Sequence, residues 1–401
     1  MKILLIHNFY QYTGGEDIYF LSLVNLLKKK NHQVYAFTRN SKNITDNFAD
    51  KLNVAVGMLL NTQVATELTD LINEFKPDIA HFHNVYPLIS PLAYHVCKKY
   101  HIPIVQTVHN YRFLCPKALL FRGGKICELC ARKRFSYLSI VFGCYHQSYL
   151  ASFIFSPAFL FHNLLKSFDY IDTYIFPAEF IRNYHVKTLH IPINKTVVFP
   201  NFIDNNKALK YHQTEISSYF LFAGRLSEEK GITQLLDTFS SLPQLKLIVI
   251  GDGPLRKQVE KYKKYKNIII KNFLPREKIF TYMKNALSTI IPSLWYEVLP
   301  MVMLESFANG TPVIVPRFGT FTTTVQEGKT GIFYEQYNFD DLKEKIIYAW
   351  ENRNKLKKMR EYAQKEYESK YTADRHYEAL MKVYENCSNW YTRSTSKIWR
   401  F

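Results

Sequence analysis

At 401 residues the chain is longer than one typical hydrophobic core, so two domains of similar size are expected. Hydrophobic residues make up 47% of the chain and charged residues only 21%, which excludes an intrinsically disordered protein. The 52 Lys and Arg residues outnumber the 34 Asp and Glu residues, and the net charge of +18 indicates an anionic partner: a nucleic acid, an anionic membrane or a phosphorylated substrate.

The chain has no apolar run of the roughly 18 residues needed to cross a bilayer, so we expect no transmembrane helix. Residues 1–7 lead directly into a polar loop with two glycines, without the small-residue cleavage site of a signal peptide. They therefore indicate a buried first strand and a cytoplasmic protein.

The first strand and the first helix are joined by a glycine turn. Residues 2–8 are mostly apolar, and residues 14–30 have the apolar periodicity of a helix. Gly14 and Gly15 stand at the turn, where backbone N–H groups can approach an anion at the helix N-terminus; the alternative is a plain tight turn. The turn lacks the Gly-x-Gly-x-x-Gly pattern of dinucleotide-binding folds, which disfavours a nicotinamide enzyme.

Further strands alternate with helical patterns along the first half of the chain. They are expected at residues 33–39, 79–83, 103–109, 173–176 and 196–200. This alternation predicts a doubly wound parallel sheet. Histidines stand at two of the strand ends, and we interpret His81 and His83 as structural and His109 as a residue for binding or proton transfer.

The alternation is interrupted between residues 112 and 149, a segment with little apolar periodicity to hold it by burial alone. Four of the six cysteines lie there, with 11, 2 and 13 residues between them: Cys115, Cys127, Cys130 and Cys144. A Cys-x-x-Cys pair flanked by two further thiols predicts a structural four-thiolate zinc site on an insertion. A redox-active pair and a chance group of reduced thiols are the alternatives.

Basic and aromatic residues follow the cysteines. Arg132, Lys133 and Arg134 precede an aromatic-rich run from residue 135 to residue 161. Cations beside aromatic rings fit a surface that sits on an anionic membrane, since the rings enter the interface and the cations meet the headgroups. The alternative is a basic rim around an ordinary hydrophobic core.

Residues 205–218 are polar and lack apolar periodicity, which indicates the boundary between two domains. A second series of strands follows, expected at residues 219–225, 245–251, 267–273, 288–293, 312–317 and 331–335. We therefore predict an α/β fold of two tandem Rossmann-like doubly wound domains with a ligand in the interdomain cleft. The first domain is residues 1–204, with the insertion at about 112–149, and the second is residues 205–401, its last helix packing back on the first domain.

Charged residues gather at the strand ends of the second domain. Arg225 follows its first strand and Lys230 stands just before a helix start, so both can converge on a diphosphate. Glu297 precedes the next such helix, at the edge where open parallel sheets bind ligands, and Glu305 lies two turns into it. These carboxylates can accept hydrogen bonds from sugar and ribose hydroxyls. The alternative is two solvated glutamates on an ordinary helix.

The ordered set of motifs resembles the retaining glycosyltransferases of family four, or glycosyl transferases group 1, which have the GT-B fold of two Rossmann domains. The resemblance covers nearly the whole chain. It is carried by Gly14-Gly15-Glu16, Thr107-x-His109, Phe176-Pro-Ala-Glu-Phe180, Pro200-Asn201 with Asp204, Gly224-Arg225 with Lys230-Gly231, Gly251-Asp-Gly253 and the stretch from Glu297 to Pro312. The chain departs from the family at Val298, where glycine is common, and at Ala178, where serine is usual.

The resemblance implies which residues bind the donor: Gly14, Gly15, Gly224, Arg225, Lys230, Glu297 and Glu305. Arg225 and Lys230 would hold the diphosphate. Glu305 would hold the ribose and Glu297 the hydroxyls of the sugar, while His109 would face the reacting sugar from the first domain.

The implied reaction is transfer of a hexose from a nucleoside diphosphate sugar to a glycan or lipid-linked hydroxyl acceptor in surface polysaccharide or capsule biosynthesis, with retained anomeric configuration. The sequence has no Asp-x-Asp motif for a divalent metal, so we expect a metal-independent enzyme without a cofactor other than the structural zinc. A peripheral position on the inner face of the plasma membrane is expected, and no nucleic-acid-binding motif is present. A nucleotide-sugar epimerase of the same fold and a non-catalytic sugar-binding protein are the alternatives.

Overall fold

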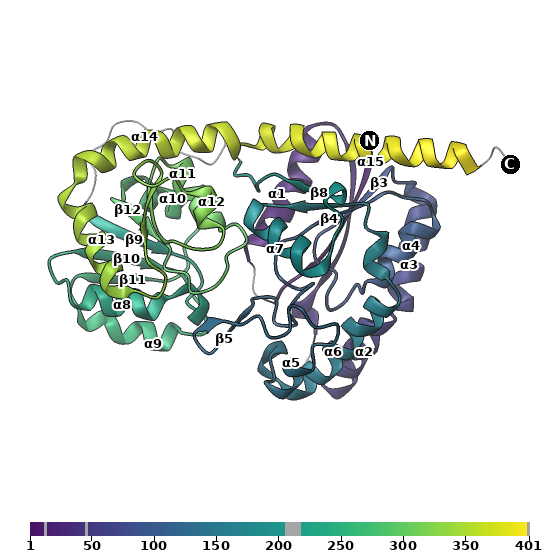
Figure 1. Ribbon diagram of the computed structural model, residues 1–401, viewed down its shortest axis with the longest axis horizontal. Coiled ribbons are helices and arrows are strands. Elements are labelled where there is room, and N and C mark those ends of the chain that lie inside the picture. The colour runs from purple at the N-terminus through teal and green to yellow at the C-terminus, as the bar shows by residue number, and fades with distance from the viewer. Residues whose placement is uncertain (12–13, 45–46, 205–217, 399–401) are drawn as a thin grey trace.

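The computed structural model describes residues 1–11, 14–44, 47–204 and 218–398, and the predicted domain boundary at residues 205–218 lies almost entirely outside them. The described residues form two six-stranded parallel sheets, one in each half of the chain (Figure 1). The strands alternate with helices in both halves, so the predicted doubly wound α/β fold is confirmed.

The first sheet has the spatial strand order β2-β1-β3-β4-β7-β8. Its strands are β1 (Lys2–Phe9), β2 (Gln33–Asn40), β3 (Ile79–Phe82), β4 (Ile104–Thr107), β7 (Thr173–Phe176) and β8 (Thr196–Val198). The helices of this half are α1 (Gly15–Lys29), α2 (Phe48–Leu59), α3 (Thr62–Phe75), α4 (Leu92–Lys99), α5 (Tyr137–Val141), α6 (Tyr149–Leu164) and α7 (Glu179–Leu189). Successive residues of β1 are buried on opposite faces, Leu4 and Ile6 on one and Ile3 and Leu5 on the other, as expected for a parallel sheet covered on both sides.

The second sheet has the order β11-β10-β9-β12-β13-β14. Its strands are β9 (Tyr219–Ala223), β10 (Lys246–Ile250), β11 (Ile268–Lys271), β12 (Ser288–Ile290), β13 (Val313–Pro316) and β14 (Gly331–Tyr334). The helices are α8 (Ile232–Ser240), α9 (Arg256–Glu260), α10 (Arg276–Asn285), α11 (Met301–Ala308), α12 (Phe321–Thr324), α13 (Phe339–Glu351), α14 (Arg353–Lys370) and α15 (Ala373–Ile398). Within the described ranges, no helix is long and apolar enough to span a membrane.

Helix α15 leaves the second half and packs on the first (Figure 1). Leu380, Val383 and Tyr384 are buried in the same core as β1 and α1. The hydroxyl of Tyr384 lies 2.7 Å from Nδ1 of His81, whose Nε2 lies 2.7 Å from the hydroxyl of Thr107. Both ring nitrogens of His81 therefore have partners inside the core.

The segment from β4 to β7 interrupts the alternation with a short hairpin, β5 (Phe121–Arg122) with β6 (Lys125–Ile126), followed by α5 and α6. The expectation that burial does little to hold this segment is wrong. Leu114, Leu120, Phe121 and Tyr145 are all buried in the main core of the first half, which anchors the insertion at several points along its length.

Candidate active site

The turn between β9 and α8 is shaped by two glycines. At Gly251 a Cβ atom would lie 1.9 Å from the carbonyl oxygen of Gly224, so only glycine allows the ends of β9 and β10 to come this close. Gly231 has φ +67°, and a Cβ there would lie 1.9 Å from the carbonyl oxygen of Pro292. This close approach brings the turn at residues 228–230 against the loop that follows β12.

Lys230 and Glu297 meet across this contact. The ammonium of Lys230 donates to Oε1 of Glu297 at 2.6 Å, and the hydroxyl of Ser293 donates to the same oxygen at 2.6 Å. Glu297 is buried, whereas the Lys230 side chain stays about a quarter exposed and lies over the Trp295 ring. A buried carboxylate is stabilised by such charge-assisted hydrogen bonds, which also fix its position. The interpretation of Glu297 as a solvated glutamate is therefore wrong.

Glu305 also has a cationic partner, one that the sequence analysis missed. Arg276, the first residue of α10, lies 2.8 Å from Oε1 of Glu305, and both side chains are largely buried. Burial raises the pKa of Glu305, and the guanidinium of Arg276 opposes this rise. The solvated-glutamate interpretation is therefore wrong for Glu305 as well. Arg276 follows the carboxyl end of β11, and the strand-end rule that selected Arg225 would have found it.

The glycine turn of the first half faces these residues. Gly14 precedes α1, and its N–H donates to Asp17 at 2.9 Å. A Cβ atom on Gly14 would lie 3.9 Å from the Arg225 guanidinium, and one on Gly15 would lie 3.0 Å from the Met301 side chain. The N-terminus of α1 thus meets the exposed Arg225 and the start of α11 at the junction of the two halves.

His109 lies at the end of β4 as predicted and is part of a group of histidines. Nδ1 of His83 is 2.9 Å from Nε2 of His109, and the Tyr19 ring of α1 packs at a tilt against the His109 ring, with the ring centres 5.1 Å apart. Burial lowers the pKa of both His83 and His109, and the neighbouring histidines lower it further. Both rings are therefore neutral near pH 7. His83, interpreted from the sequence as structural, is the direct neighbour of His109.

A buried carboxylate lies beside this histidine group. Oε2 of Glu16 accepts hydrogen bonds from Tyr10 at 2.9 Å and Asn110 at 3.1 Å. Burial raises the pKa of Glu16, partly offset by His7 at 3.9 Å. The sequence analysis did not select Glu16, although it follows the two glycines directly.

The loop after His109 reaches the second half. The Tyr111 ring lies 6.4 Å from the Trp295 ring, and Glu297 is close enough to contribute to the raised pKa of Tyr111, after burial and Tyr184. Leu294, Trp295 and Val298 are buried in the core of the first half. This packing connects the His109 loop to the Glu297 loop.

The four cysteines of the insertion lie in one neighbourhood. Burial raises the pKa of Cys130 to about 11, and the nearby thiols of Cys115, Cys144 and Cys127 add to the rise. Thiolates are suitable zinc ligands. Within the part of the chain that the structure describes, however, no three His, Cys, Asp or Glu side chains are arranged to hold a metal ion. The zinc site therefore stays a prediction.

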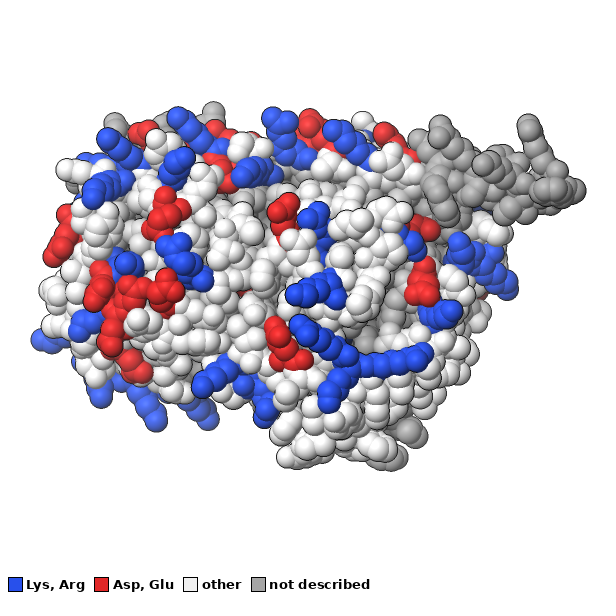
Figure 2. All heavy atoms as spheres, viewed as in Figure 1, with Lys and Arg blue, Asp and Glu red and all other residues white. Residues whose placement is uncertain are grey.

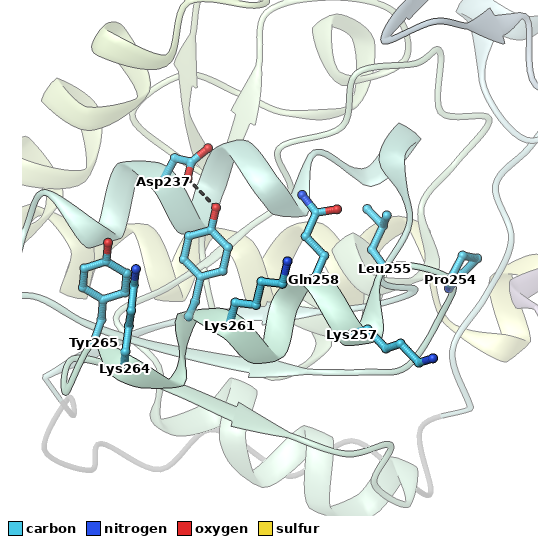
Figure 3. A pocket seen from close by; sticks show the side chains of 9 residues that line it. Asp237, Pro254, Leu255, Lys257, Gln258, Lys261, Lys264 and Tyr265 are labelled. Atoms are coloured by element: carbon cyan, nitrogen blue, oxygen red, sulfur yellow. Dashed lines mark hydrogen bonds between the residues drawn. The ribbon is translucent and has the colours of Figure 1, made fainter.

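A cavity of about 580 Å³ lies elsewhere in the second half, between α8, α9 and the turn before β11 (Figure 3). Its lining includes Lys257, Lys261 and Lys264, and Tyr262 donates a hydrogen bond to Asp237 across it. None of the predicted site residues lines this cavity.

The fold and the charged residues at the sheet junction define a class of protein, the GT-B proteins with two Rossmann-like domains. The similar Anabaena protein Alr3699/HepE, solved in complex with UDP, has a TM-score of 0.67 at 16% identity over 96% of this chain and all of that one. An uncharacterised glycosyltransferase of Methanocaldococcus jannaschii is 24% identical over 97% of this chain and 99% of the relative. The O-antigen chain mannosyltransferase C of Escherichia coli is 23% identical over 53% of this chain and 58% of its own length.

The family follows from two matches that together span most of the chain. The model of Glycosyltransferase Family 4 matches residues 13–207, and the model of Glycosyl transferases group 1 matches residues 204–366. The chain belongs to this family of GT-B glycosyltransferases.

Proposed function

We propose that the protein transfers a hexose from a nucleoside diphosphate sugar to a hydroxyl acceptor, with retained anomeric configuration and without a metal ion. The observation that carries the proposal is the convergence of Arg225, Lys230, Glu297 and the N-terminus of α1 at one junction. Two cations and a helix N-terminus there can stabilise the charge that develops on a departing diphosphate. The UDP complex of the similar Anabaena protein supports a nucleotide ligand.

The carboxylates have positioning roles in this proposal. Lys230 and Ser293 hold one oxygen of Glu297, which orients the carboxylate toward hydroxyls of the donor sugar. Arg276 holds one oxygen of Glu305 in the same way, and Glu305 binds the ribose diol. Neither group acts as a covalent nucleophile. The diphosphate itself takes the proton of the acceptor hydroxyl on the face from which it departs.

His109 contacts the reacting sugar from the first half. As a neutral imidazole it can donate one hydrogen bond to a sugar hydroxyl while its Nε2 stays paired with His83. The acceptor that we propose is a lipid-linked glycan of a surface polysaccharide, and the similarity to an O-antigen chain mannosyltransferase supports this class. The enzyme then works at the inner face of the plasma membrane.

The first experiment is a thermal-shift screen of nucleoside diphosphate sugars, because a ligand that binds only the folded state raises the melting temperature. The donor found is then incubated with lipid-linked glycan acceptors. We expect a new glycoside whose anomeric configuration, read by NMR, equals that of the donor. An altered sugar nucleotide formed without any acceptor would instead identify an epimerase, and donor binding without any product would identify a sugar-binding protein.

Metal independence is tested in the same assay. Exhaustive EDTA treatment should leave the initial rate unchanged when the assay begins promptly. A loss of rate that magnesium or manganese specifically restores would overturn this part of the proposal.

A further inference from the structure

Helix α6 is apolar on its outer face as well as its inner face. Its residues from Tyr149 to Leu164 include no Lys, Arg, Asp or Glu. Phe155 and Phe159 point into the core, yet Tyr149 and Leu150 on the other side are 69% and 66% exposed. A helix that is apolar all round is normally buried all round. The outer face of α6 therefore has the composition of a surface that another apolar phase covers.

The exposed apolar surface extends from α6 onto its neighbour α5. The two helices pack together, and Gly143 between them approaches the start of α6 closely. We call the exposed side chains of Tyr137, Val141, Phe142, Tyr149, Leu150 and Phe153 the α5–α6 face. In Figure 2 the lobe formed by these helices, at the lower right, carries few charged side chains, and Lys and Arg side chains lie along its upper edge. Contiguous apolar patches of this kind mark interaction sites, whereas single exposed residues do not.

Cations touch the aromatic rings of this face directly. The guanidinium of Arg122 lies 3.8 Å from the centre of the Phe142 ring. The ammonium of Lys133 donates to the hydroxyl of Tyr137 at 2.9 Å and lies 4.6 Å from its ring centre. Between residues 112 and 166 the sequence has eight Lys or Arg residues and one acidic residue, Glu128. The surroundings of the face are therefore strongly cationic.

Exposed apolar side chains beside cations favour some classes of binding partner over others. Protein interfaces are depleted of lysine, and nucleic acids offer no apolar phase for leucine and valine side chains. An anionic bilayer offers both an apolar interior for the rings and phosphates for the cations. Helix α6 has 16 residues, about 24 Å at the usual helical rise, and one of its sides is buried in protein, so it can lie in the interface but not span a bilayer.

Behind this face, the inner side of α6 connects to the histidine group through Arg112. The guanidinium of Arg112 lies 5.3 Å from the ring centres of both Tyr145 and Phe155, on the inner side of α6. Arg112 also lines a small cavity together with His83 and His109. A membrane under α6 would therefore lie on the side of the first half that leads to His109.

We propose that the α5–α6 face docks the protein on a lipid bilayer with anionic headgroups, with the exposed rings and aliphatic side chains in the interface and Arg122, Lys133 and their basic neighbours on the phosphates. The inference goes beyond sugar transfer, since docking is measured on vesicles that contain neither donor nor acceptor.

The experiment is co-sedimentation of the full chain with phosphatidylcholine vesicles and with vesicles that also contain phosphatidylglycerol. We expect binding to the anionic vesicles, weakening as salt rises because exposed charges are screened. A double variant, Leu150→Glu with Phe153→Glu, should lose at least about tenfold in affinity for the anionic vesicles, because two apolar side chains no longer enter the interface. The matched control, Leu21→Glu with Tyr362→Glu, changes exposed residues of α1 and α14 and should bind like the wild type.

A second pair of variants tests the cations. Arg132→Ala with Arg134→Ala should reduce binding to anionic vesicles and flatten its salt dependence, whereas Lys357→Ala with Lys358→Ala, which removes two exposed lysines of α14, should not. Equal wild-type binding to both vesicle types, or none to either, would overturn the proposal. So would a dimer in solution that Phe153→Glu converts to monomer, since the face would then join two copies. The Leu150→Glu, Phe153→Glu variant is also assayed for transfer to a soluble acceptor. This assay tests the proposed reaction without the membrane, so a failure of docking can be told apart from a failure of sugar transfer.

Discussion

Lys230 is the residue whose loss should have two separable effects. Lys230→Ala removes a cation from the proposed diphosphate site, and transition-state stabilisation should fall by about 2 to 4 kcal/mol if Lys230 acts like a typical oxyanion donor. It also removes one of the two hydrogen bonds that Oε1 of the buried Glu297 accepts from Lys230 and Ser293, which should lower the free energy of unfolding by about 1 to 3 kcal/mol. Steady-state kinetics and urea unfolding measure the two effects.

Arg225→Ala provides the contrast at the same site. Its loss should reduce transfer by a factor similar to that of Lys230→Ala. Because Arg225 is exposed, the free energy of unfolding should stay within about 0.5 kcal/mol of the wild type. Lys257→Ala, in the separate cavity of Figure 3, is the matched control and should change neither quantity. Wild-type turnover in folded Arg225→Ala or Lys230→Ala protein would remove that residue from the diphosphate site.

Buried histidines should make the protein sensitive to acid. Burial lowers the pKa of His81 to about 3 and that of His185 and His376 to about 4. Below pH 6.5 the unfolded chain binds protons at these rings and the folded chain does not, so stability falls as pH falls toward 4. Each ring contributes at most about 1.4 kcal/mol per pH unit. Urea unfolding at pH 7, 6 and 5 measures the slope.

One variant isolates a single ring. His185→Phe keeps an aromatic ring stacked on Tyr111, at 5.5 Å in the wild type, but cannot titrate. Its stability should fall less steeply as the pH falls, because the unfolded variant binds about one proton fewer than the unfolded wild type. An unchanged slope in His185→Phe would show that His185 does not bind a proton on unfolding.

At the scale of elements, the cysteine insertion carries its own prediction. Burial raises the pKa of the Cys130 and Cys144 thiols, and the nearby thiols of Cys115 and Cys127 raise it further, so a bound cation would remove the repulsion between thiolates and draw the four side chains together. We expect about one zinc per chain by elemental analysis of protein purified without a metal-affinity tag. Cys127→Ser should lose it and become more sensitive to proteolysis between residues 112 and 149.

The control for the zinc prediction is Cys387→Ser. Cys387 lies on α15 beside Thr173, far along the chain from the insertion, and its replacement should leave the zinc content unchanged. Protein without zinc that is as resistant to proteolysis as zinc-containing protein would contradict the prediction. The assignment of the donor site would stand, because its residues lie outside the insertion.

The main strands were predictable because each is a short apolar run ending in polar or glycine residues. Thr173–Phe176 was predicted to the residue, and the other main strands differ only at their ends. The hairpin of β5 and β6 was missed because strands of two residues contain no alternation to detect. The pairs Lys230–Glu297 and Arg276–Glu305 depend on the strand order β11-β10-β9-β12, which places loops side by side. Sequence periodicity carries no information about that order.

At the scale of the whole molecule, α14 and α15 run along one side of both halves (Figure 1). Tyr19 of α1 lies 2.9 Å from Nε2 of His376, whose Nδ1 lies 2.8 Å from the carbonyl oxygen of Pro200. Helix α15 thus completes the hydrophobic core that β1 and α1 form in the first half of the chain. A change in α15 should therefore act on the first sheet and not on the second, although α15 follows the second sheet in sequence.

Leu380→Ala tests this directly. Leu380 is fully buried between α1 and the first sheet, so truncation should cost about 2 to 5 kcal/mol. Native-state hydrogen exchange should then show lost protection in β1 and β3, while β9 and β10 keep theirs, because local opening follows the packing of each core. Lys382→Ala, two residues further along α15 and exposed, should leave both sheets unchanged. Equal losses in β1 and β9 would instead mean that the two halves open as one cooperative unit, with α15 as the element that joins them.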